Sequence, residues 1–144
     1  MKSLVVLFLF ITVAQAKDST VNSFDESTFL QSLIAGQYNL IGKSLNSQNT
    51  YLGEVSISDG ESESELQITR VINGKITIGK AKIEQTMEKT HVLRIHFTEN
   101  EINYEQTCLI GSDLDNYARL TCHLYEPEKH TKNPGLEALF IKQE

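Results

Sequence analysis

From Gly36 onward the chain is a succession of short runs rich in β-branched and aromatic residues, separated by turn residues. Runs of this length and spacing are typical of the strands of a β-sandwich or β-barrel. Both prolines, Pro127 and Pro134, fall between the last two runs, so every predicted strand keeps its backbone N–H groups. We expect eight strands, over residues 36–43, 51–58, 64–72, 75–83, 91–98, 102–110, 117–125 and 136–142.

Asn73 and Gly74 lie between two of these runs and give the strongest hairpin signal in the chain. A type I′ turn needs positive φ at both central positions, which Asn and Gly tolerate. The register set by this turn gives two faces. On one face, Ile72 pairs with Lys75, Ile68 with Gly79 and Leu66 with Ala81. On the other face, Glu65 pairs with Lys82 and Gln67 with Lys80. Pairing bulky with tiny residues on the apolar face is a way to fill a narrow barrel.

The cysteines, Cys108 and Cys122, predict a second hairpin, because two cysteines in a small domain most simply form a disulfide in an oxidising compartment. Facing cysteines place Ile110 opposite Leu120 and Gln106 opposite Leu124. All the apolar residues of this set then lie on one face, and a slip of one residue would turn them to water. The cross-link closes a loop of ~15 residues and should stabilise the fold by ~3 kcal/mol.

The other runs alternate in the same way. Leu93, Ile95 and Phe97 share one face of their run, and polar residues occupy the other. One dry and one wet face on consecutive strands is the pattern of an antiparallel sheet that closes on its own core. The sequence therefore predicts an all-β fold, an eight-stranded antiparallel up-and-down β-barrel, with one domain over residues 36–144.

Residues 1–16 have the order of a secretory signal peptide. Lys2 supplies the positive charge, residues 4–11 are unbroken apolar sequence, and Ala14 and Ala16 give a small-x-small cleavage site. The apolar run is about half of the ~20 residues that cross a bilayer, so we expect no stable membrane anchor. We expect cleavage between Ala16 and Lys17 and export to the periplasm or the medium.

Residues 17–35 form an N-terminal segment with one predicted helix. Ser23 and Glu26 have the spacing of a capping box. Phe29, Leu30, Leu33 and Ile34 follow at helical spacing, before Gly36. A short helix in this place would plug or cover one end of the barrel.

The mature chain is acidic. Removal of Lys2 leaves twelve basic against nineteen acidic residues, a net charge of −7. A surface of this charge disfavours nucleic acid and anionic lipid as partners.

These features together resemble the lipocalin-like (calycin) group of small exported bacterial barrels, some of which resemble avidin in shape and some of which carry a fibronectin-binding label. The resemblance covers residues 36–142. It rests on Gly36-Gln37-Tyr38, on Tyr51-x-Gly53-x-Val55-x-Ile57, on the Asn73-Gly74 turn with Gly79-Lys80-Ala81, and on Gly135-Leu136-Glu137-Ala138-Leu139.

The chain departs from that group in having no tryptophan. Tyr38 stands where lipocalins usually have a Trp, and avidins line their site with tryptophans. The departure argues against biotin as a ligand, and no family ligand residue carries over to this sequence.

No motif of catalysis is visible, so we expect no catalytic residues, no cofactor and no enzyme. The sequence has no Gly-x-Ser-x-Gly, and both cysteines are assigned to the disulfide. The acidic clusters are interpreted without catalysis. Asp113 and Asp115 are interpreted as turn residues in a loop. Glu61, Glu63 and Glu65 are interpreted as solvent-exposed charges along a strand start. We expect no metal site, with the histidines scattered over the surface: His91, His96, His123 and His130.

Arg70 is a charged residue on a face assigned to the interior, between Ile68 and Ile72. A buried, unpaired guanidinium is very costly. One hypothesis is that the strand twists outward near its turn and leaves Arg70 at a solvated rim. The other is that Arg70 lies at the mouth of a cavity and pairs with an anionic head group. Candidate ligand-binding residues are then Arg70 with the hydroxyls of Tyr38, Tyr51 and Tyr104.

Two functions fit such a barrel, and a third possibility is an envelope protein whose activity no motif records. The first is a non-enzymatic module that binds a protein partner, as inhibitors and adhesins do, through its outer face or through loops at 45–50, 111–116 and 126–134. The alternative is a carrier or sensor of a small apolar ligand inside the barrel. An eight-stranded barrel is either filled by side chains or just wide enough for one small ligand, so a cavity would distinguish the two.

Overall fold

The computed structural model describes residues 26–112 and 117–143. The predicted signal sequence with its cleavage site at Ala16 and Lys17, Ser23 of the capping box, and Asp113 and Asp115 lie outside these residues. The elements in chain order are α1 (Glu26–Ile34), β1 (Gly36–Lys43), β2 (Thr50–Asp59), β3 (Leu66–Ile72), β4 (Lys75–Gln85), β5 (His91–Glu99), β6 (Ile102–Ser112), β7 (Ala118–Tyr125) and β8 (Gly135–Ile141).

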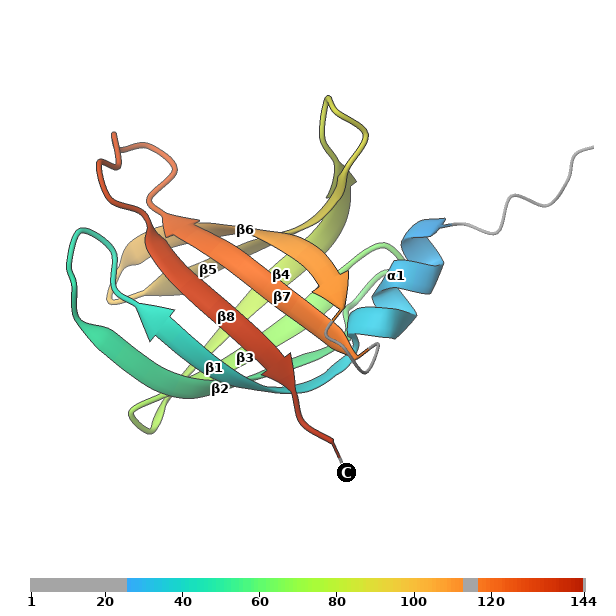
Figure 1. Cartoon of the computed structure of the whole chain (residues 1–144), viewed down its shortest axis with the longest axis horizontal. Coiled ribbons are helices and arrows are strands. Elements are labelled where there is room, and N and C mark those ends of the chain that lie inside the picture. Colours follow the sequence, from blue (N-terminus) through green and yellow to red (C-terminus); the bar gives the residue numbers. More distant parts are fainter. Residues whose placement is uncertain (1–25, 113–116, 144) are drawn as a thin grey trace, which may run out of the picture.

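The eight strands form a closed antiparallel barrel in sequence order, as predicted (Figure 1). Each strand pairs with the next, and β8 returns to β1, where Tyr38 faces Ile141 and Lys43 faces Leu136. Closure gives both edges of every strand a hydrogen-bonded partner, which removes the exposed edges that promote aggregation.

Both predicted registers are confirmed. At the β3–β4 turn, Ile72 faces Lys75, and Asn73 and Gly74 have φ of 51° and 77°. Between β6 and β7, Cys108 faces Cys122 and the two sulfurs form a disulfide. The alternation of buried and exposed residues therefore follows the predicted phase along both hairpins.

The predicted strand ends differ from the observed ones by at most two residues, and the largest consequence lies before β3. Residues 60–65 are a connection and not the start of a strand, because the Gly60 amide donates to the Glu65 carbonyl and turns the chain. Glu61 and Glu63 therefore do not alternate along a strand. Glu65 pairs with Lys80 at 3.0 Å and not with Lys82, because β3 begins only at Leu66.

The two ends of the barrel differ. Helix α1 lies at one end (Figure 1), where Ile34 is fully buried and the Tyr38 hydroxyl donates to the Ile34 carbonyl at 2.7 Å. Figure 1 shows the β1–β2 and β7–β8 loops at the opposite end. In an up-and-down barrel the β3–β4 and β5–β6 turns belong to that same opposite end, which we call the open end.

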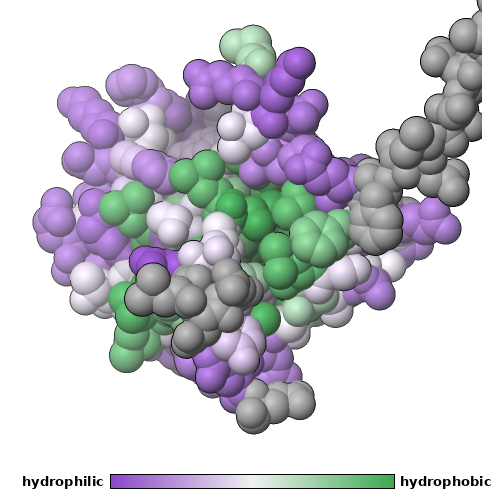
Figure 2. Space-filling model, turned by 45° about the vertical axis from the view of Figure 1, so that its right-hand side comes forward, coloured by the Kyte–Doolittle hydropathy of each residue, from purple (hydrophilic) through white to green (hydrophobic). Residues whose placement is uncertain are grey.

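Two of the three loops predicted to bind a partner, residues 45–50 and 126–134, lie at the open end. The third loop follows β6 and so begins at the α1 end, away from the other two. The outer surface is not uniformly polar: Figure 2 shows a group of hydrophobic side chains in the middle of one face.

Candidate functional site

Arg70 lies inside the barrel. Its side chain is 3% exposed, and it shares the inward phase of Ile68 on β3. The hypothesis of a solvated rim position is therefore wrong, because β3 keeps its pleat and its pairing with β4 up to the Asn73 turn. A guanidinium at this depth needs a counter-charge.

Glu137 on β8 supplies that charge. Its carboxylate accepts two parallel hydrogen bonds from Arg70, at 2.7 Å from Nη1 to Oε2 and 2.6 Å from Nη2 to Oε1. Glu137 is itself 1% exposed. Bidentate Arg–carboxylate pairs are among the strongest hydrogen-bonded contacts in proteins.

Two further side chains complete the network around Glu137. The Gln106 amide accepts from Arg70 Nη1 at 3.2 Å and donates to Glu137 Oε2 at 2.6 Å. The Tyr51 hydroxyl donates to Glu137 Oε1. The network thus joins β2, β3, β6 and β8 through the interior of the barrel.

The charges of the network stabilise each other. Burial by itself would raise the pKa of Glu137, but the hydrogen bonds and charge of Arg70, with Tyr51 and Gln106, hold that pKa below its ordinary value. Burial would lower the pKa of Arg70, and Glu137 more than offsets this. Burial and the Glu137 charge raise the pKa of Tyr51, so its proton stays on the hydroxyl. The pair is therefore ionised and Tyr51 is neutral at neutral pH.

Two aromatic rings lie beside the guanidinium. Arg70 Cζ is 4.4 Å from the centroid of the Phe97 ring, a cation–π contact. The Phe97 ring stacks in turn on Tyr104, with centroids 5.4 Å apart and planes inclined by 25°. Arg70 Nε is buried and has no hydrogen-bond partner within the described part of the chain.

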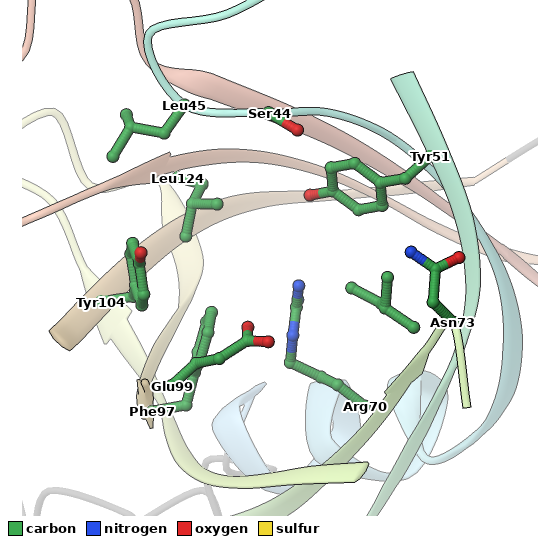
Figure 3. Close-up of a pocket in the computed structure, with 10 residues that line it drawn as sticks. Ser44, Leu45, Tyr51, Arg70, Asn73, Phe97, Glu99, Tyr104 and Leu124 are labelled. Atoms are coloured by element: carbon green, nitrogen blue, oxygen red, sulfur yellow. The ribbon is translucent and has the colours of Figure 1, made fainter. Parts of the chain in front are cut away.

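A cavity of about 320 Å³ lies at the open end, above this network (Figure 3). Figure 3 shows the Arg70 guanidinium in the middle of the lining side chains, with the Tyr51 hydroxyl pointing toward the same space. At the rim, Lys75 pairs with Glu99 at 3.2 Å. The cavity is lined by Ser44, Leu45, Tyr51, Arg70, Ile72, Asn73, Phe97, Glu99, Tyr104 and Leu124.

The structure brings three of the four predicted ligand residues together, because Tyr51, Arg70 and Tyr104 all line the cavity. Tyr38 does not line it, and its hydroxyl is engaged by the Ile34 carbonyl at the α1 end. The predicted anionic ligand at Arg70 would have to compete with Glu137 for the guanidinium.

Sequence reasoning missed Glu137, Gln106, Phe97 and Glu99 as parts of the site. The signal was present, since each has the inward phase of its strand: Glu137, for example, lies two residues from buried Leu139. Alternation identifies an inward residue, but it does not say which inward residues meet across the barrel.

Residues 26–112 and 117–143 contain no group of three or more His, Cys, Asp or Glu side chains that could hold a metal ion. In the same part of the chain, no helix has the length and apolar character needed to cross a membrane.

The closed eight-stranded antiparallel barrel is consistent with a calycin-like fold. Comparisons of the chain with protein-family models, with curated proteins and with solved structures find no match.

Proposed function

We propose that this protein binds a small ligand in the open end of its barrel and acts as a carrier or sensor of that ligand. The observation that carries the proposal is the cavity of about 320 Å³ whose lining includes Arg70, Tyr51 and Tyr104. Small-molecule sites are concave, range over ~300–1,000 Å³ and place a few polar groups among apolar walls. A cavity at the lower end of this range suits a compact ligand.

The contrast between the two ends supports this proposal. Buried Tyr38 and Ile34 fill the α1 end, while polar side chains surround the space at the other. Replacing a buried ion pair by well-packed apolar residues is often neutral or even stabilising. A network such as Arg70–Glu137 is therefore not needed for stability alone, which favours a role for it in recognition.

We propose binding rather than catalysis at this site. Arg70 and Glu137 shift each other's pKa away from neutrality and toward the charged forms. General acid–base catalysis works best with groups whose pKa lies near the operating pH. The network is thus suited to holding a ligand and poorly suited to moving its protons.

We also propose that the chain is exported through its N-terminal signal and belongs with the exported bacterial lipocalin-like barrels. The Cys108–Cys122 disulfide supports export, because disulfides persist in oxidising compartments. Intact-mass measurement of the protein from its host tests this: a mature chain that begins at Lys17 supports export, and a chain that retains Met1 or its neighbours contradicts it.

Native mass spectrometry of the protein from its host, followed by a thermal-shift screen of small molecules, tests the ligand proposal. Ile72→Trp should fill the cavity and abolish binding of any ligand found. Ile78→Trp is the matched control, because Ile78 lies on the outer face and is 63% exposed. Equal binding by the two folded variants, or no ligand in either experiment, would contradict the proposal.

A protein partner is the second candidate, favoured by apolar residues on the outer wall. Ile41 and Leu52 face each other on β1 and β2, and are 52% and 70% exposed. Ile76 on β4 is 65% exposed. Cross-linking in an envelope extract should recover one defined partner that Leu52→Lys loses and Thr98→Lys keeps. Recovery of the same proteins with both variants contradicts this candidate.

A further inference from the structure

We infer that the cavity takes a small aromatic molecule with a protonated amine, and that Glu99 binds its ammonium group. The inference rests on the proposed ligand-binding function and names the chemistry of the ligand.

The first step is that the charge of Arg70 is already compensated by Glu137. Both of its Nη atoms are engaged by Glu137, and Nη1 also donates to Gln106. An anionic ligand that accepted a hydrogen bond from the remaining Nε–H or Nη2–H of Arg70 would lie beside the Glu137 carboxylate, which repels it, and one that took the place of Glu137 would displace a carboxylate that is 1% exposed. A displaced Glu137 would be a buried charge without compensation, which is strongly destabilising.

The second step is that Glu99 can exchange its partner. Its side chain lines the cavity and is 28% exposed, and Figure 3 shows its carboxylate directed toward the middle of the lining group. Its partner Lys75 is 48% exposed and is not part of the cavity lining. Exposed ion pairs of this kind contribute little free energy. A ligand ammonium can therefore replace Lys75 at small cost, whereas an anion cannot replace Glu137.

The third step is that the aromatic groups beside Glu99 suit a cation. Tyr51 is held in the Arg70–Glu137 network, because its hydroxyl donates to Glu137 and its oxygen interacts with Arg70. Tyr104, stacked on Phe97, offers a ring for stacking and for cation–π attraction. The pKa of Tyr104 is raised by burial and then by the carboxylates of Glu126 and Glu99, as expected where the potential is negative.

Calorimetric titration with three molecules of nearly equal shape tests the inference: 2-phenylethylamine, 2-phenylethanol and 3-phenylpropionate. At neutral pH they carry an ammonium, a neutral hydroxyl and a carboxylate on the same ring and chain. We expect the amine to bind about tenfold tighter than the alcohol, since a charged hydrogen bond adds to the same ring contacts. The carboxylate should bind most weakly.

Three variants test whether Glu99 is the source of the preference for the amine. Glu99→Gln should reduce the affinity for the amine to that for the alcohol and leave the alcohol unchanged. Lys75→Gln should raise the affinity for the amine, because it removes the competing cation. Lys80→Gln is the control, since Lys80 pairs with Glu61 and Glu65 away from the cavity and should change nothing.

The alternatives have distinct outcomes. Equal or tighter binding of the alcohol or the carboxylate, or an amine affinity that does not respond to Glu99→Gln, overturns the inference and leaves the ligand-binding proposal standing. The same holds if a different class of ligand occupies the cavity and none of the three probes binds. If the host protein carries no ligand and the screen finds none, the proposed function fails as well.

Discussion

Arg70 Nη2 lies 2.6 Å from Glu137 Oε1 inside the barrel, although the residues are 67 positions apart in sequence. They belong to β3 and β8, which are not neighbours in the sheet. Their contact crosses the interior of the closed barrel, in which β8 pairs with β1. The pair therefore couples closure of the barrel to the geometry of the candidate site.

Removal of one partner should cost far more than removal of both. Arg70→Met leaves the Glu137 carboxylate buried and unpaired, and we expect a loss of ~3–5 kcal/mol in the free energy of unfolding. The double variant Arg70→Met, Glu137→Leu should recover most of this loss, because neither charge remains. Urea denaturation of the single and double variants measures the coupling, and additive single effects would contradict the buried pair.

The same pair predicts a pH dependence of stability. The pKa of Glu137 is lowered below its ordinary value of 4.5, so the unfolded state binds more protons than the folded state as the solution becomes acidic. The contribution of Glu137 to the free energy of unfolding is complete above pH 4.5. It is lost as the pH falls toward the pKa that Glu137 has in the folded state. Thermal unfolding between pH 6 and pH 3 should show a steeper loss for the wild type than for Glu137→Gln. Parallel curves would exclude Glu137 as the source.

The disulfide should stabilise the fold without shaping the cavity. Cys108 and Cys122 close a loop with a sequence separation of 14, and a cross-link of this length contributes ~3 kcal/mol. The double Cys→Ala variant should unfold at lower urea concentration and still bind the cavity ligand once folded. Thr121→Ala, on the outer face of the same strand, is the control and should change stability little.

Gly42 should be needed for the position of Tyr51. The two residues face each other on β1 and β2, and a Cβ at Gly42 would overlap the Tyr51 ring. Gly42→Ala should therefore displace the Tyr51 hydroxyl from Glu137, lower stability and weaken ligand binding. Gly111→Ala is the matched control, because the nearest atom to its Cβ would be the Arg119 carbonyl at 3.7 Å. Unchanged binding by folded Gly42→Ala would show that Tyr51 does not position the ligand.

The strand registers were predictable because local signals determine them. The Asn73-Gly74 turn sets β3 against β4, and the cysteines set β6 against β7. Residues 64 and 65 were mistaken for strand because the glutamates of the connection alternate, although no apolar residues alternate with them. The contact of Arg70 with Glu137 was out of reach, because it depends on the stagger of all eight strands around the barrel.

An NMR titration of methyl-labelled protein with small aromatic amines, alcohols and acids tests the central claim, that the open end of the barrel is the ligand site. The account predicts that the molecules that bind shift the methyl signals of Ile72 and Leu124, which line the cavity, and leave Ile34 at the α1 end unmoved. Shifts confined to the outward-facing Ile41 and Leu52, or binding that leaves Ile72 untouched, would contradict it.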